Sequence, residues 1–163
     1  MRAIIHPAAF LCGLLLLTGC GMIRSVTTEV VADGPDQGIQ QALFTERPDD
    51  LLRAAAEACI EPGQFLLRPG PDSVTCESLP MPEIAAALIL RYDGTVSDLP
   101  HYVISFTAAA LRDGYLVTTE NFIRVPQRQG PALLIRLQDP MITDAFRDML
   151  IAAGGTLVTA PPA

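Results

Sequence analysis

The sequence predicts an α+β fold: a small two-layer sandwich in which an antiparallel meander sheet is covered on one face by an N-terminal and a C-terminal helix. Three observations lead to this prediction. Apolar residues recur at helical spacing over 50–60, two long alternating runs flank Asp113-Gly114, and Asp139-Pro140 begins a second amphipathic stretch. With 163 residues, half of them apolar and 18% charged, the chain has the size and composition of one globular domain.

The first predicted helix spans 50–60. Asp49 and Asp50 would supply its N-cap and a negative first turn, which suits the positive end of a helix. Short strands are expected at 64–68 and 73–77, because a Pro- and Gly-rich turn separates them.

The clearest local pattern is a β-hairpin formed by 102–112 and 115–125 around Asp113-Gly114, a two-residue turn of type I′ composition. Pairing outward from this turn places Phe106 opposite Asn121. One face then becomes apolar and the other mostly polar, as in a half-solvated antiparallel sheet. The apolar face would carry Tyr102, Ile104, Phe106, Ala108, Ala110, Val117, Ile123 and Val125.

Two more strands are expected beside this hairpin. The first is 86–92, which runs directly into a turn, and the second is 132–137. A short apolar run does not separate strand from helix by periodicity, so Ala85–Leu90 could instead form a helix after Pro82. Strand is the favoured interpretation for that run.

The last predicted helix begins at Asp139, a good N-cap, followed by Pro140 at the first helical position. Gly154-Gly155 would end it. A short strand could follow at 156–159, before a tail at 160–163. The apolar stripe of this helix would consist of Ile142, Phe146, Met149, Leu150 and Ala153.

The charge of the chain argues against two classes of partner. The formal net charge is −7, and the eleven basic residues are all Arg. Nucleic-acid binding needs clustered Lys and Arg against the phosphates, so we expect none here. An acidic chain also gains little from anionic lipid surfaces.

The N-terminus has the pattern of a secretory signal. Arg2 precedes a continuous apolar run over 8–17, which is too short to span a bilayer as a helix but fits a signal-peptide core. The run ends in Leu17-Thr18-Gly19-Cys20, which resembles the lipobox of bacterial lipoprotein precursors. This resemblance covers the lipobox region alone and says nothing of the globular domain.

The resemblance implies cleavage between Gly19 and Cys20 and attachment of lipid to the Cys20 thiol. Two or three acyl chains would hold the protein stably on a membrane, since each buried methylene contributes about 0.8 kcal/mol. Gly21 follows the modified cysteine, where Asp would favour retention in the inner membrane. The resemblance therefore implies the outer membrane, facing the periplasm.

Processing at this site divides the chain into four parts. These are a signal peptide (1–19), the lipidated cysteine with a flexible tether (20–48), a single α+β domain (49–159) and the tail. A short helical turn at Ile39–Phe44, within the tether, is one further possibility.

The same processing leaves two cysteines to pair. Cys12 would depart with the signal peptide and Cys20 would carry lipid, so Cys59 and Cys76 are expected to form one disulfide in an oxidising periplasm. A redox pair would favour Cys-x-x-Cys spacing, which is absent. A zinc site would need more ligands than the single histidine of the processed chain offers, so no metal or other cofactor is expected.

Residues that could support catalysis are few. His101 is the one histidine after processing, and Ser105 on the same strand would lie about 13 Å away, beyond direct proton transfer. Glu120, expected opposite Thr107 on the polar face, could act as a general base. The sequence has no Gly-x-Ser-x-Gly motif and no phosphate-binding loop, so an enzyme is disfavoured.

The function expected by exclusion is that of a non-catalytic envelope accessory, which binds protein partners or supports a larger membrane complex. The polar sheet face or an exposed sheet edge could recruit such a partner. The alternative is a periplasmic carrier of a small apolar ligand or lipid. The small residues Ala108–Ala110 could leave room for such a ligand, but close packing of the two helices is the favoured interpretation there. A small hydrolase is the third hypothesis.

Overall fold

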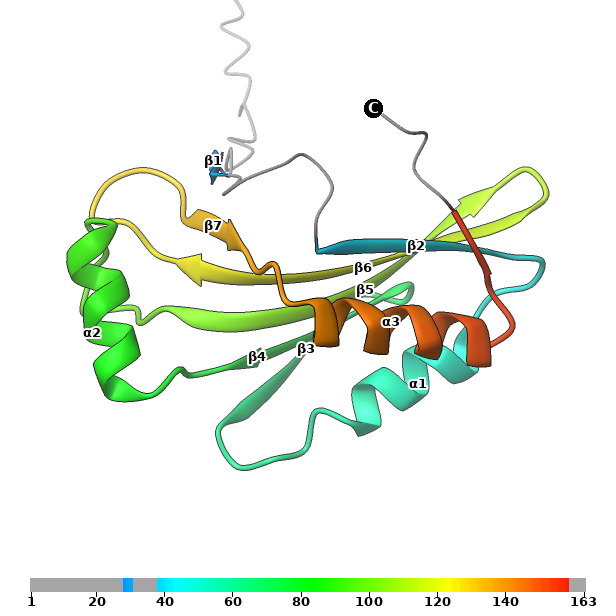
Figure 1. Ribbon diagram of the computed structural model, residues 1–163, viewed down its shortest axis with the longest axis horizontal. Coiled ribbons are helices and arrows are strands. Elements are labelled where there is room, and N and C mark those ends of the chain that lie inside the picture. Colours follow the sequence, from blue (N-terminus) through cyan, green and yellow to red (C-terminus); the bar gives the residue numbers. More distant parts are fainter. Residues whose placement is uncertain (1–27, 31–37, 159–163) are drawn as a thin grey trace, which may run out of the picture.

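The computed structural model describes residues 28–30 and 38–158 (Figure 1). Within these residues the fold is α+β, with three helices and a mostly antiparallel sheet of eight strands. The elements are β1 (Thr28–Val30), β2 (Ile39–Phe44), α1 (Asp49–Glu57), β3 (Gln64–Gly70), β4 (Ser73–Ser78), α2 (Pro82–Arg91), β5 (His101–Leu111), β6 (Gly114–Val125), β7 (Leu133–Arg136), α3 (Pro140–Ala152) and β8 (Thr156–Leu157).

Strand β6 lies at the centre of the sheet. On one side it pairs with β5 along most of its length. On the other side β2 pairs with Tyr115–Glu120, and β7 pairs with Phe122–Val125. The order β3-β4-β5-β6 therefore continues into two branches, one made of β2 and β8 and the other of β7 and β1. Among the described strands only β1 and β7 pair in parallel.

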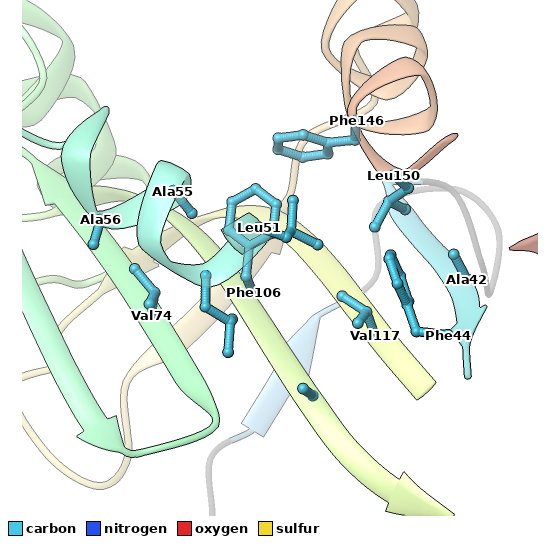
Figure 2. Packing of buried hydrophobic residues seen from close by; sticks show 12 residues of the cluster. Ala42, Phe44, Leu51, Ala55, Ala56, Val74, Phe106, Val117, Phe146 and Leu150 are labelled. Carbon is cyan, nitrogen blue, oxygen red and sulfur yellow. The ribbon is translucent and has the colours of Figure 1, made fainter. Parts of the chain in front are cut away.

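The main hydrophobic core joins α1 and α3 to strands β2, β4, β5 and β6 (Figure 2). Phe106 of β5 meets Phe146 of α3 edge to face, with ring centroids 5.8 Å apart. Leu150 of α3 and Val117 of β6 are fully buried beside them. The buried members of this cluster are Ala42, Phe44, Leu51, Leu52, Ala55, Ala56, Val74, Phe106, Ala108, Val117, Phe146 and Leu150.

The predicted hairpin is confirmed, but its register differs by two residues. Phe106 lies opposite Thr119 and not Asn121, and Arg112 and Asp113 occupy the turn. In this register Gly114 pairs with Leu111 and lies against β2, where a Cβ would meet the carbonyl oxygen of Phe44 at 2.2 Å. Its φ of 141° also requires glycine. Side chains alternate with a period of two, so this shift leaves every residue on its predicted face.

Strand β2 corrects the prediction for Ile39–Phe44, which form no helical turn. They pair with β6 over six residues, and Ala42 and Phe44 point into the core while Leu43 between them is exposed. The residue types of this segment do not alternate between apolar and polar, because Leu43 is apolar and exposed, so the strand could not be recognised without its partner. The folded region therefore begins before Asp49, inside the segment expected to be a tether.

Helix α2 corrects the favoured prediction of a strand at 86–92. Pro82 occupies the start of the helix, and Ala85 and Ile89, four residues apart, are its buried residues. That spacing places both on one helical face. The alternative reading of Ala85–Leu90 as helix is the correct one.

The other elements follow their predictions closely. The strands expected at 64–68, 73–77 and 132–137 are present as β3, β4 and β7, and β8 forms near the expected position. Asp139 caps α3 by accepting hydrogen bonds from the backbone N–H groups of Met141 and Ile142. Helix α1 differs at its start, because its N-cap is Pro48 and no side chain caps it.

Candidate functional site

An apolar cleft of about 260 Å³ lies between α1 and α3, over strands β3 to β5. Small side chains of α1 and of its C-cap residue create the cleft, because Ala54, Ala55 and Ala58 leave room that larger residues would fill. Phe106 and Phe146 lie side by side at its inner wall, between the two helices (Figure 2). The remaining lining residues are Cys59, Gln64, Val74, Cys76, Ile104 and Met149.

The predicted disulfide between Cys59 and Cys76 forms one side of this cleft. It joins the end of α1 to β4, with the two Cα atoms 5.7 Å apart. Cys59 is buried, as expected for a structural bridge. The disulfide therefore holds the α1 wall of the cleft against the sheet.

The chemistry of the cleft is that of an apolar receptor. Gln64 is the one lining residue with a polar side chain besides the disulfide sulfurs, and no lining residue carries a charge. Ala54 and Ala58 are exposed and Met149 is partly exposed, so the cleft opens to solvent. Such a site can bury an apolar group, but it has no acid, base or nucleophile positioned for a reaction.

Glu120 lies away from this cleft, on the opposite face of β6. The observed register places it opposite Ser105 and not Thr107. Arg136 of β7 donates a hydrogen bond to its carboxylate at 3.3 Å. Burial nevertheless raises the pKa of the Glu120 carboxyl above its ordinary value. A raised pKa suits a proton acceptor, but the described neighbours supply no nucleophile-and-base pair.

His101 belongs to a separate polar cluster at the start of β5. Arg124 of β6 donates to His101 Nδ1 at 3.2 Å, and the same guanidinium contacts Glu77 at 3.1 Å and Asp98 at 3.5 Å. The ring of Phe65 meets the His101 imidazole edge on, with centroids 6.2 Å apart. These contacts account for His101 as part of a structural ion-pair cluster.

The candidates for catalysis are therefore not brought together. His101 pairs with Arg124 across the hairpin, whereas Ser105 pairs with Glu120 four residues further along β5. That separation corresponds to about 13 Å along an extended strand. Within the described residues no group of three or more His, Cys, Asp or Glu side chains could hold a metal ion.

For the alanines of β5, the favoured interpretation of close packing holds at Ala108. Ala108 is buried against the core opposite Val117, while Ala109 and Ala110 are exposed. Close packing is therefore the role of Ala108. The cleft lies beside Ile104 and Phe106 instead, and its open rim at Ala54 and Met149 could not be recognised from the sequence.

The lipobox residues Leu17 to Cys20 lie outside the described residues. In the part of the chain that is described, no helix is both long enough and apolar enough to cross a membrane. Comparison of the chain with protein-family models, curated proteins and solved structures found no match. The function must therefore be inferred from the site itself.

Proposed function

We propose that this chain is a lipid-anchored, non-catalytic accessory protein of the bacterial cell envelope, and that it binds a partner protein through the cleft between α1 and α3. The observation that carries the proposal is the cleft itself, which is solvent-accessible, lined by apolar side chains and free of charged groups. The two-layer arrangement predicted for the domain, with α1 and α3 covering one sheet face, is part of the proposal. The core that these helices share with the sheet supports it.

The anchor follows from the sequence. The motif Leu17-Thr18-Gly19-Cys20 supports cleavage before Cys20 and acylation of its thiol, and Gly21 favours the outer membrane. An oxidising periplasm is consistent with the disulfide between Cys59 and Cys76. The binding cleft would then face the periplasm.

The size of the cleft favours a protein partner over a whole small molecule. Pockets for drug-sized ligands have volumes of about 300–1,000 Å³. The cleft, at about 260 Å³, lies just below this range. Protein interfaces often concentrate their affinity in one large apolar side chain inserted into a pocket. The partner we propose therefore inserts one bulky apolar side chain between α1 and α3.

Site-specific photocrosslinking in intact cells tests this proposal. A photoreactive amino acid at Ala54, on the rim of the cleft, should form one discrete adduct with a second protein. The matched control is Ala152, an exposed alanine of α3 that does not line the cleft. A filled cleft, made by Ala58→Trp, should abolish the adduct from position 54. Equal adducts from positions 54 and 152, or an adduct that survives Ala58→Trp, would contradict the proposal.

The apolar lining also favours a second candidate, a carrier of a small apolar ligand. A ligand filling the cleft would have to be small, given the volume of about 260 Å³. Native mass spectrometry of gently purified protein should then reveal a bound mass that Ala58→Trp displaces. An unliganded protein in every preparation would eliminate this alternative.

A further inference from the structure

Five of the exposed large apolar side chains belong to the segment around α2. We call residues 79–100, the segment between β4 and β5, the α2 end. Leu90 is 83% exposed, Val96 80% and Met81 64%, and Leu79 and Leu99 are also exposed. Where exposed apolar side chains share one surface, that surface commonly contacts a partner or a membrane.

The α2 end lies where the anchored part of the chain enters the sheet. Thr28 pairs with Leu133, and Leu133 pairs with Val125 at the end of β6. The residue after Val125, Pro126, accepts a hydrogen bond at 3.1 Å from the backbone N–H of Thr95, which belongs to the α2 end. Thr28 and the α2 end therefore occupy the same end of the sheet.

The chain between the proposed anchor and Thr28 is short. Eight peptide units separate Cys20 from Thr28. A fully extended chain advances at most about 3.6 Å per residue, so Thr28 cannot be further than about 29 Å from the lipidated cysteine. The end of the sheet that holds Thr28 and the α2 end is therefore the end nearest the anchor, whereas the Arg112-Asp113 turn lies at the far end of the β5–β6 hairpin.

The charges of the α2 end show what kind of contact is possible. Residues 79–100 contain three carboxylates, Glu83, Asp93 and Asp98, against one guanidinium, Arg91. Attraction to anionic headgroups requires clustered basic residues, which this segment lacks. Its apolar side chains can instead enter the boundary between headgroups and acyl chains of an uncharged bilayer.

We infer that the α2 end is a membrane-contact surface, with Met81, Leu90 and Val96 seated in the bilayer interface. The inference rests on the lipid anchor proposed at Cys20, since that anchor places this end near the membrane. Contact here would orient the domain and leave the far end of the β5–β6 hairpin pointing into solvent.

The test uses the full-length lipidated protein in phosphatidylcholine vesicles. An environment-sensitive fluorescent amino acid replaces Leu90 in one sample and Leu111, at the far end of β5, in the matched control. The probe at position 90 should emit at shorter wavelength on vesicle binding and be quenched by lipids brominated on their acyl chains, and the probe at 111 should not. Anionic lipid should not strengthen the effect.

The outcomes separate this inference from the anchor. Mass spectrometry of the purified protein first establishes whether Cys20 carries lipid; an unmodified Cys20 would overturn the anchor and the inference with it. If Cys20 is lipidated but position 90 behaves as in water, the membrane-contact surface alone is refuted. Equal quenching at positions 90 and 111 would refute it as well, because the contact would have no orientation.

Discussion

Helices α1 and α2 are both short and rich in alanine, yet their outer surfaces differ. Helix α1 buries Leu51, Leu52, Ala55 and Ala56 and carries charged residues on its outer side. Helix α2 buries Ala85 and Ile89, and its exposed residues include further alanines and Leu90.

The charges of α1 do little to stabilise the fold. Arg53 contacts Asp50 at 2.6 Å and Glu57 at 3.5 Å, but all three side chains are well exposed. Exposed ion pairs contribute about 0–1 kcal/mol to the free energy of unfolding. The charged side chains therefore mainly keep the outer surface of α1 hydrated. Helix α2 carries one exposed carboxylate, Glu83, and one exposed guanidinium, Arg91, and Leu90 is its exposed large apolar side chain. Under the membrane contact proposed above, α1 borders water and α2 borders the bilayer interface.

The largest expected effect comes from truncating equivalent leucines in the two helices. Leu51→Ala removes a side chain that is 4% exposed within the core. It should lower the free energy of unfolding by about 2–5 kcal/mol, because it leaves a cavity. Leu90→Ala should change it by less than about 0.5 kcal/mol, as expected for a surface position. Denaturant titration of the two variants measures both free energies of unfolding. Equal losses would contradict the assignment of Leu51 to the core and of Leu90 to the surface.

Removing the disulfide should loosen α1 and leave α2 in place. The bridge closes the loop from Cys59 to Cys76, a separation of 17 residues. Replacing both cysteines with alanine should cost about 3 kcal/mol of stability in the chain-entropy model. Hydrogen exchange should accelerate most in α1, since the bridge attaches its end to β4. Uniform acceleration in α1 and α2 would show that the bridge acts on the whole domain.

Helix capping offers a smaller contrast. Asp139 accepts hydrogen bonds from two backbone N–H groups at the start of α3, whereas no side chain caps α1. Asp139→Ala should therefore cost about 1 kcal/mol. Asp49→Ala breaks an exposed ion pair with Arg47 at 2.7 Å and should cost less. Thermal unfolding of both variants would rank them, and a larger loss at Asp49 would contradict the assignment of the caps.

The smallest effect concerns Glu120, on the sheet face away from the cleft. Burial raises its folded pKa above the ordinary value of 4.5, so folding favours the protonated carboxyl. The ionised form opposes folding at neutral pH, and this opposition is relieved as the pH falls through the folded pKa toward 4.5. Relative to Glu120→Gln, the wild type should therefore gain stability on acidification. A difference that does not vary with pH would show that Glu120 titrates alike in the folded and unfolded chain.

Several elements could be predicted because their signals are local. The start of α3 at Asp139-Pro140 could be predicted because the cap involves only the first turn of the helix, where Asp139 accepts from the N–H groups of Met141 and Ile142. The alternation along β5 and β6 assigns each residue to a face whatever the register. The pairing of Cys59 with Cys76 could be predicted without a structure, because Cys12 was expected to leave with the signal peptide and Cys20 to carry lipid.

The errors occur where a distant partner decides the local structure. Strand β2 forms because β6 provides its pairing groups, and the hairpin, whose strand β6 also pairs with β2, has a register two residues from the predicted one. Helix α2 could not be separated from a strand because its buried residues, Ala85 and Ile89, are defined only by what packs on them. Interactions of this kind join residues far apart in the chain, which local patterns do not report.

The sequence by itself therefore determined the α+β class, the two faces of the central hairpin, the helix beginning at Pro140 and the cysteines that pair. These follow from backbone preferences and from side-chain periodicity over neighbouring residues. Only the tertiary structure decided that β2 belongs to the sheet and that a cleft opens between α1 and α3. It also decided that Thr28 and the α2 end lie at the same end of the sheet, because strands distant in sequence are paired there.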